Sequence, residues 1–529
     1  MSFIRPTGCL GSLWGFIFYS MRCLFIILIV LFGPRGISQP GFNQSYDFGQ
    51  LGAGFGSLEL SGDTLVVYGT IKQNNQPSFG LLFAQVDTLG NLIHYTVYND
   101  SLGHDFTAVK PNSFIKLSSN SGYAGVAHIF QRTNGCLGLF DNQGELTKFI
   151  EFEDANSIVD FYKEVIEVAD GFLVLGDKQN ASNGVLDIFI MKTDFEGNKI
   201  WEKKFSTPGR QTLFGSVLIL DENEYVISAT TTTVQGVPLP QRRNTSKIFA
   251  IDSIGNIKWQ WESQPSLEEL GAGSISRTPE GNWAYTSGRG WYNATYNEIS
   301  RQPKFIIRDE DFNIIREDTF GVADFPINGL HKALSLHEGG WLLIGVKPVH
   351  YPIPPVPMWY NSFSGWMVRL DCEGDQLWSR VDTAFWSYET GSTNYYYDAV
   401  ELPGGSLVVC GYSRTYEPAP KDWGWLIKVS PDGCLDTLFC SPVSALSPIV
   451  PDLAVSLYPN PASSTVHIRS EGVAAWDRIE VYNAAGQAVR VLHDSREGRV
   501  ELGGLPDGLY FIRLTKAGQT VTKKVIKRR

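Results

Sequence analysis

A unit of roughly 57 residues recurs along most of this 529-residue chain, and such a period limits the fold to repeat architectures. Each unit contains a tight turn followed by an apolar strand, seen most clearly at 62–69, 170–176, 339–345 and 404–411. A second motif follows it: a strand, an Asp-x-x-Gly turn and another strand. The turn reads Asp-x-x-Gly-Asn at 87–91, 194–198 and 252–256. At 141–144 and 371–374 it keeps the Asp and the Gly, and around Asp309 and Ser430 one of these two residues is replaced.

The Asp-x-x-Gly turn predicts a β-hairpin. Asp caps a turn with its side chain, and Gly takes the left-handed conformation without steric cost. A calcium loop is the alternative interpretation, but the alternating acidic ligands of such a loop are missing. Seven units fit between about residue 48 and residue 440, each with four strand-like segments, and this arrangement predicts an all-β, seven-bladed β-propeller. A pair of β-sandwiches is the rival fold, although it would not explain so even a repeat.

The repeats resemble those of quinoprotein-like and other bacterial propellers, in which a Trp follows a similar Asp-x-x-Gly turn. Trp201, Trp259 and Trp378 occupy that position, whereas His94 departs from it. The resemblance covers most of residues 48–440 and implies architecture only. The vicinal cysteine pair of quinone-dependent dehydrogenases is missing, and seven units are counted rather than eight, so no cofactor is expected.

Charge is spread unevenly along the chain. Residues 39–450 hold 29 Lys and Arg against 47 Asp and Glu, a balance of −18, whereas residues 451–529 hold 12 against 8, a balance of +4. An acidic body repels phosphate backbones, so nucleic acid is not an expected partner. Aromatic residues make up 13% of the chain and Gly is abundant at 53, which favours strands and turns.

The first 38 residues are typical of a secretory signal peptide. Arg22 precedes an apolar run at 23–32, and small residues follow before Gln39. Met21 is an alternative start. A membrane anchor over 14–32 is the competing interpretation, but it would place Arg22 within the bilayer at a cost of about 2.5–3.5 kcal/mol. No later segment approaches the length needed to span a membrane, so we expect no transmembrane segment in the mature chain.

The repeat ends near residue 446, and residues 447–529 have a different pattern. They contain Tyr458-Pro459-Asn460-Pro461, a Gly508-x-Tyr510 strand and a basic end that includes Lys523 and Lys524. In this order the motifs resemble the type A, Por-like sorting domain that Bacteroidetes proteins use for type IX secretion. The resemblance implies a small immunoglobulin-like β-sandwich, the type IX machinery as partner, and a secreted or surface-anchored protein that has passed through the periplasm. An independent immunoglobulin-like binding module is the alternative.

Long insertions between strands are expected on one face of the propeller, and loops of this kind on a rigid scaffold often carry function. The insertions include 289–303, 347–364 and 383–395, and their aromatic side chains suit a sugar or a protein partner. The predicted ligand-binding residues are Tyr351, Trp359, Tyr360, Trp386 and Tyr388, with Tyr395 and Tyr396 nearby. Alternatively, these aromatic residues pack on one another to stiffen the loops.

No catalytic motif occurs in the sequence. The His-Glu-x-x-His, Gly-x-Ser-x-Gly and phosphate-binding Gly-Lys-Ser patterns are absent, as is any Cys/His cluster suited to a metal. We therefore expect a non-catalytic binding or adhesion protein for a glycan or a protein. The alternative is a secreted polysaccharide-acting hydrolase with carboxylates that converge in the propeller channel.

Five cysteines follow the leader, an odd number that leaves at least one thiol unpaired. Cys434 and Cys440 flank a short segment and are the predicted disulfide. The pairing of Cys136, Cys372 and Cys410 stays open.

Overall fold

The computed structural model describes residues 41–108, 110–130, 132–233, 241–266, 270–293, 298–321, 329–348, 362–385, 392–416, 419–435, 455–460, 462–470, 476–483, 488–495, 498–516 and 519–528. Every regular element in these ranges is a β-strand. The chain forms two compact units, residues 1–445 and 446–529, called unit 1 and unit 2 below.

Unit 1 is built from consecutive antiparallel blades; the first five are separate sheets, and the last two are joined in one sheet. The sheet of blade 1 contains β2 (Gly52–Ser61), β3 (Thr64–Lys72), β4 (Phe79–Asp87) and β5 (Leu92–Tyr98). In blade 2 the inner strand is divided in two, and the sheet contains β6 (Phe106–Thr107), β7 (Phe114–Lys116), β8 (Tyr123–Ile129), β9 (Asn134–Phe140) and β10 (Leu146–Phe152).

The next three blades have the same four-stranded order. Blade 3 contains β11 (Ser157–Val168), β12 (Gly171–Asn180), β13 (Leu186–Thr193) and β14 (Lys199–Phe205). Blade 4 contains β15 (Arg210–Asp221), β16 (Glu224–Thr233), β17 (Asn244–Ile251) and β18 (Ile257–Glu262). Blade 5 contains β19 (Ile275–Arg277), β20 (Trp283–Asn293), β21 (Glu298–Arg308) and β22 (Ile314–Thr319).

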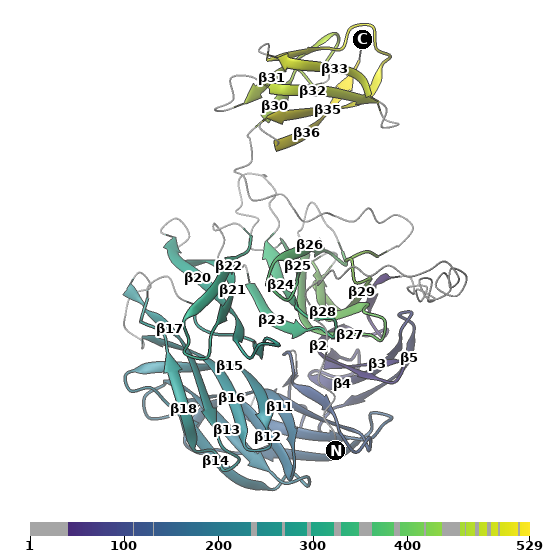
Figure 1. Ribbon diagram of the computed structural model, residues 1–529. Coiled ribbons are helices and arrows are strands. Elements are labelled where there is room, and N and C mark those ends of the chain that lie inside the picture. The colour runs from purple at the N-terminus through teal and green to yellow at the C-terminus, as the bar shows by residue number, and fades with distance from the viewer. Residues whose placement is uncertain are drawn as a thin grey trace, which may run out of the picture. The chain divides into compact units, whose positions relative to one another are not determined.

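The last two blades share a short parallel contact between β25 and β27. Blade 6 contains β23 (Gly329–Ser335), β24 (Trp341–Pro348), β25 (Ser362–Leu370) and β26 (Gln376–Asp382). Blade 7 contains β27 (Ser392–Glu401), β28 (Leu407–Thr415), β29 (Lys421–Val429) and β1 (Phe42–Tyr46). Inner strands such as β2, β15 and β23 gather toward the middle of unit 1, and outer strands such as β5, β14 and β18 lie at its edge (Figure 1). The prediction of a seven-bladed propeller is confirmed.

Blade 7 differs from the expected unit because its fourth strand comes from the other end of the repeat region. β1 pairs antiparallel with β29 in the register Phe42↔Lys428 to Tyr46↔Gly424. The sequence count began near residue 48 and assigned four strands to every unit, so it missed this strand. Antiparallel addition of β1 closes the ring and covers an edge that would otherwise be open.

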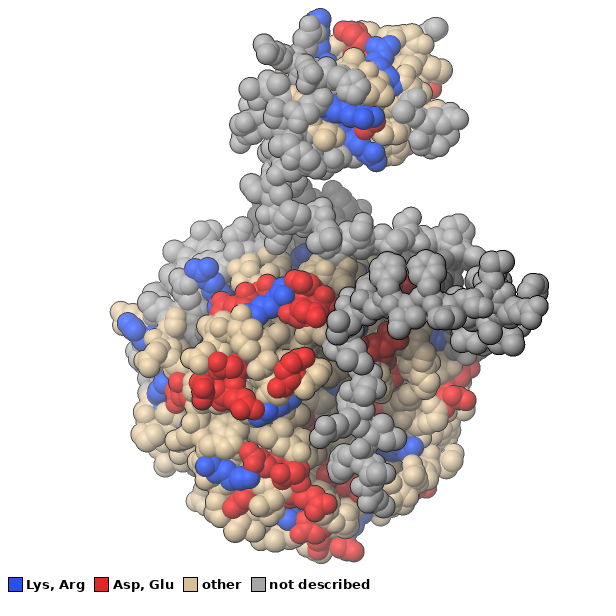
Figure 2. All heavy atoms as spheres, in the orientation of Figure 1, with Lys and Arg blue, Asp and Glu red and all other residues tan. Residues whose placement is uncertain are grey.

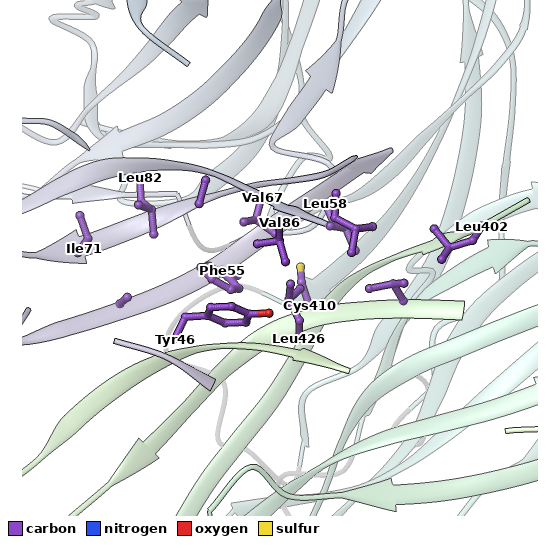
Figure 3. Close-up of a cluster of buried hydrophobic side chains, with 14 residues drawn as sticks. Tyr46, Phe55, Leu58, Val67, Ile71, Leu82, Val86, Leu402, Cys410 and Leu426 are labelled. Atoms are coloured by element: carbon purple, nitrogen blue, oxygen red, sulfur yellow. The ribbon is translucent and has the colours of Figure 1, made fainter. Parts of the chain in front are cut away.

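Side chains from blades 1 and 7 share one apolar core at this closure (Figure 3). Phe55 of β2 and Leu426 of β29 are fully buried in it, and Tyr46 of β1 is 6% exposed. The Tyr46 hydroxyl donates to the Gly90 carbonyl at 2.7 Å, which ties β1 to the turn between β4 and β5. The closure is therefore held by a packed core as well as by backbone pairing.

The Asp-x-x-Gly turns have the expected hairpin geometry. In the first copy, Asp87 Oδ1 accepts from the backbone N–H groups of Leu89 and Asn91, both at 2.8 Å, and Gly90 has a φ of +93°. The copy at Asp309 keeps the same frame, but Phe312 takes the left-handed position with a φ of +63°. Its ring stacks on that of Trp261 at a centroid distance of 4.8 Å, which offsets the strain.

Unit 2 is a sandwich of two antiparallel sheets. One contains β30 (Val455–Tyr458), β31 (Thr465–Ser470) and β34 (Arg499–Glu501). The other contains β32 (Trp476–Asn483), β33 (Ala488–Ser495), β35 (Gly508–Lys516) and β36 (Gln519–Lys527). Val466 and Val500 from the first sheet and Ile479, Ile512 and Val525 from the second form a common core. The predicted small β-sandwich is confirmed.

Candidate functional site

The inner strands of unit 1 are interrupted at a common level by β-bulges. The register with the second strand of the blade shifts there in blades 1, 3, 4, 6 and 7. A bulge places one extra residue outside the ladder and leaves its neighbours without regular backbone partners. The extra residues are Gly56, Lys163, Gly215, His331 and Tyr397.

The residue after the bulge is polar in all five of these blades. In blades 2 and 5, Ser113 and Ser274 hold this place, since their carbonyls accept from Val126 and Thr286 of the second strands at 2.7 and 2.9 Å. We call the seven residues the axial ring: Ser57, Ser113, Glu164, Ser216, Ser274, Lys332 and Asp398. Their spacing follows the sequence repeat, so the ring is a structural layer of the propeller.

Three side chains of the axial ring, those of Glu164, Ser216 and Asp398, accept from a backbone N–H of the neighbouring blade. Oε2 of Glu164 in blade 3 accepts from the backbone N–H of Val217 in blade 4 at 3.3 Å. The Ser216 hydroxyl oxygen accepts from Ile275 N–H in blade 5 at 2.9 Å. A buried N–H freed by a bulge requires an acceptor, and a polar side chain from the preceding blade supplies it.

Lys332 cannot act in this way because an ammonium group has no acceptor. The backbone N–H of Ala399, in the following blade, donates instead to Oδ1 of Asp398 at 2.7 Å. Lys332 forms an ion pair with Asp398 and donates to Oδ1 of Asn112 at 2.8 Å. Asn112 in turn donates its side-chain N–H to Oε1 of Glu164 at 3.0 Å. Residues from blades 2, 3, 6 and 7 thus form one buried polar network.

Two glutamates near this network hold their protons unusually tightly. Burial raises the pKa of Glu164 to about 8, against the opposing charge of Lys332. Burial, followed by the negative charge of Asp398, raises the pKa of Glu59 to about 8 as well. Glu59 lies on β2 two residues beyond the ring position. Both carboxyl groups are therefore mostly neutral at pH 7.

A cavity of about 520 Å³ opens beside the axial ring, lined by inner-strand residues of several blades. Its charged lining residues are Lys110, Lys163, Glu164, Arg301 and Lys332. Its walls also contain His331, Tyr395 and Tyr397, together with glycine residues and hydroxyl side chains from the region of blades 4 and 5. The volume lies within the range of small-molecule sites in proteins.

An aromatic wall forms one side of the cavity. The rings of Tyr395 and Tyr397 are nearly parallel, at an interplanar angle of 17°, and Tyr412 stacks against Tyr395 at 5.4 Å. The His331 ring lies 5.9 Å from that of Tyr397. Burial lowers the pKa of His331 to about 4, so its imidazole is neutral, and its buried Nε2 has no hydrogen-bond partner among the described residues.

The predicted ligand-binding aromatics, Tyr351, Trp359, Tyr360, Trp386 and Tyr388, lie outside the described residues, so that prediction stands untested. Of the two tyrosines expected near them, Tyr395 lines the cavity, whereas Tyr396 is fully buried and stacks on Trp425 at 4.4 Å. The insertion 289–303 was expected to be a loop. Its paired residues instead extend the β20–β21 hairpin, as the register Arg289↔Gln302 shows.

The cysteines are divided between disulfides and buried thiols. Cys372 and Cys434 are disulfide-bonded, and Cys440 lies outside the described residues, so the predicted Cys434–Cys440 pairing stays a prediction. Cys136 and Cys410 are free, and burial raises the pKa of both thiols, which makes them unreactive.

In the described part of the chain, no three His, Cys, Asp or Glu side chains are placed to share a metal ion. The same residues include no helix with the length and hydropathy to cross a bilayer.

The predicted sorting residues of unit 2 are partly brought together. Asn460 accepts from the backbone N–H of Ile526 at 2.9 Å and donates to the Lys524 carbonyl at 3.0 Å, so the start of the motif contacts the basic terminal strand. Tyr458 is half exposed and stacks on His467. The other described motif residues are Pro459 at the end of β30, Gly508 and Tyr510 on β35, and Lys523 on β36, while Pro461 lies outside the described residues.

The two units also differ in the charge of the surface in view. Figure 2 shows groups of acidic side chains on unit 1 and several Lys and Arg side chains on unit 2. This agrees with the charge balance along the sequence.

Comparison with known families identifies unit 2. Residues 456–528 match the secretion system C-terminal sorting domain, so this part of the chain is a sorting domain of the type IX secretion system. The predicted resemblance is confirmed, and the protein is an exported β-propeller with a Bacteroidetes-type sorting domain. The search of curated proteins gave no match.

Solved structures similar to the chain have low sequence identity. A protein of unknown function from Dyadobacter fermentans is 12% identical with a TM-score of 0.39, covering 74% of this chain and 98% of that one. The α-L-arabinofuranosidase arb93a from Fusarium graminearum is 8% identical with a TM-score of 0.35, covering 74% and 98%. The β-propeller domain of the trilobed protease from Pyrococcus furiosus is 11% identical with a TM-score of 0.35, covering 70% and 93%.

Proposed function

We propose that this protein is a non-catalytic binding protein, exported through the periplasm by its sorting domain, that holds a glycan or protein ligand through unit 1. The observation that carries the proposal is the cavity of about 520 Å³ beside the axial ring. A rigid ring of blades surrounds it, and its lining combines charged, hydroxyl and aromatic side chains, as binding sites for polar ligands require. An N-terminal signal peptide ending near residue 38 and final delivery to the cell surface or the medium complete the proposal.

The buried carboxyl groups favour binding over hydrolysis. Both oxygens of Glu164 accept hydrogen bonds from the protein, from Asn112 and from the Val217 N–H. Both oxygens of Asp398 are likewise engaged, by Lys332 and by the backbone N–H groups of Leu58 and Ala399. A general acid or base needs an oxygen that faces the substrate.

A polysaccharide hydrolase remains the second candidate, because one observation favours it. Glu59 and Glu164, each with a pKa raised to about 8, are near the ion-paired Asp398, and catalytic acids are tuned by environments of this kind. Incubation of the purified protein with a panel of polysaccharides, followed by measurement of new reducing ends, separates the two. Turnover that is lost in Glu164→Gln would replace the binding proposal by the hydrolase.

The position of the ligand is tested by two sets of variants. Gly329 lines the cavity, and a Cβ atom built there meets no atom within 4 Å, so Gly329→Phe would fill the cavity without a clash at Cβ. We expect this variant to lose glycan-array binding while keeping its thermal stability. The double variant Trp359→Ala/Trp386→Ala tests the long-loop face, which is the face that carries the long insertions. If binding is lost in this double variant and kept in Gly329→Phe, the site lies on the loops and not in the cavity.

A further inference from the structure

Positive charge in the cavity exceeds the negative charge available to neutralise it. Lys163 pairs with Asp177, and Lys332 pairs with Asp398, so two of the four cationic side chains are compensated within the protein. Lys110 and Arg301, both exposed, form no ion pair with a carboxylate among the described residues, and Asp177 acts on Lys110 only from a distance. The sole acidic side chain of the described lining is Glu164, whose pKa of about 8 leaves it mostly neutral at pH 7.

The uncompensated charge lies close to the other polar groups of the cavity. Lys110 is exposed to solvent at the cavity, and desolvation, followed by the charge of Lys163, lowers its pKa against the opposing charge of Asp177. The charges of Lys110 and Lys332 in turn contribute to the lowered pKa of His331. Lys110 and Lys332 thus place positive potential around the neutral His331 ring, and an anion bound there would be attracted by both ammonium groups.

A second feature restricts the chemical class of the anion. The tyrosine wall presents a broad, half-apolar surface of stacked rings, and His331 Nε2 offers an unused hydrogen-bonding atom beside it. A sugar ring combines apolar C–H faces with hydroxyl groups and fits such a wall. A small inorganic anion would leave the wall without a contact.

We propose that the cavity binds an acidic saccharide, with its carboxylate at Lys110 and Arg301 and a sugar ring against Tyr395 and Tyr397. This inference rests on the proposed binding function and names its ligand class. The specificity for an acidic ligand then comes from Lys110 and Arg301, because the carboxylates of the axial ring are used to join the blades.

The test compares two probes that differ in charge, tri-galacturonate and the neutral galactotriose, by isothermal titration calorimetry with the full chain. We expect binding of tri-galacturonate at least tenfold tighter than that of galactotriose, and weaker binding at 0.5 M NaCl because salt screens the attraction. Lys110→Gln/Arg301→Gln should reduce the affinity for tri-galacturonate at least tenfold. The matched control Lys148→Gln/Lys199→Gln removes the same charge from outer strands and should bind normally.

The possible results separate this inference from the proposed function. Equal binding of both saccharides, abolished by Gly329→Phe, would overturn the acidic ligand and leave a glycan site in the cavity. Binding of tri-galacturonate that persists in Gly329→Phe would place the anion outside the cavity and overturn the inference too. If neither saccharide binds, while a protein ligand is found on the long-loop face, both the inference and the cavity site are wrong.

Discussion

The backbone N–H of Leu58 donates to Oδ2 of Asp398 at 3.2 Å, which joins the first blade of the ring to the last. The same carboxylate forms an ion pair with Lys332, whose side chain is only 12% exposed. Asp398 therefore satisfies a freed backbone donor and neutralises a nearly buried cation in one position. Among the residues of the axial ring, we expect substitution of Asp398 to lower the stability of unit 1 most.

Replacing Asp398 with Ala should strongly destabilise unit 1. The substitution leaves Lys332 charged without its partner, and the loss of one member of a buried ion pair typically costs about 3–5 kcal/mol. Urea unfolding measures the change in the free energy of unfolding. The double variant Asp398→Ala/Lys332→Met should recover part of the loss, and an Asp398→Ala protein as stable as the wild type would show that the network does not support the fold.

Raising the pH from 6.5 to 8 should lower the stability of unit 1. The folded protein keeps protons on Glu59 and Glu164 up to about pH 8, whereas in the unfolded chain these groups lose their protons near the ordinary value of 4.5. The unfolded chain thus binds fewer protons, and the free energy of unfolding falls by up to about 1.4 kcal/mol per pH unit for each group. His331 acts in the opposite direction, but only below its ordinary pKa of 6.5.

Urea titrations at several pH values between 6.5 and 8 give this slope directly. Glu164→Gln should flatten it, and Glu59→Gln should do so less, since Glu59 is more exposed and better screened. Equal slopes in the wild type and both variants would show that the two groups do not titrate in this range.

Removing the Tyr46 ring should weaken the closure between blades 1 and 7. Tyr46→Ala deletes a buried aromatic side chain and its hydrogen bond to Gly90, and large-to-small changes of this kind cost about 3–5 kcal/mol. Hydrogen exchange should show faster exchange in β1 and in the facing strand β29. The control Tyr458→Ala changes a half-exposed tyrosine in unit 2 and should leave exchange in unit 1 unaltered.

Deleting residues 447–529 should block export beyond the periplasm while unit 1 still folds. Each unit has a buried core of its own, and unit 2 matches the sorting domain family. Cell fractionation followed by limited proteolysis measures both effects. Normal surface delivery of the shortened chain would refute a role of unit 2 in sorting.

A milder change, Asn460→Ala, removes two hydrogen bonds between the start of the sorting motif and β36. We expect less of this variant to be delivered beyond the periplasm than of the wild type, as measured by the same cell fractionation. Gln519→Ala, at the start of β36, serves as a control within the same sheet.

The repeat was enough to predict the blades because each Asp-x-x-Gly turn is a local signal: Asp87 and Asp252 bond to their own turns. The closing strand could not be predicted in this way, since the pairing of Phe42 with Lys428 is set by tertiary structure and not by a local motif. Phe312 shows the same limit, because aromatic stacking stabilises it where the motif calls for glycine.

The axial ring could have been found from the sequence but was missed. Ser57, Glu164 and Asp398 recur at the period of the repeat, and aligning the units on the glycine turns would have placed them at one level. The cavity was beyond such an alignment. It depends on which bulged residue each blade carries, and a series such as Gly215, His331 and Tyr397 has no common chemical type.

The pairing of β1 with β29 also imposes an order on assembly. β1, the first strand of the described residues, gains its partner only after Lys421–Val429 has been synthesised. Blades 1 to 6 can each form from contiguous chain, but the ring stays open through their synthesis and translocation. Contacts of such long sequence separation form slowly. The open ring exposes the free edge of β29 until β1 docks on it, and an unpaired edge of this kind can pair with another chain.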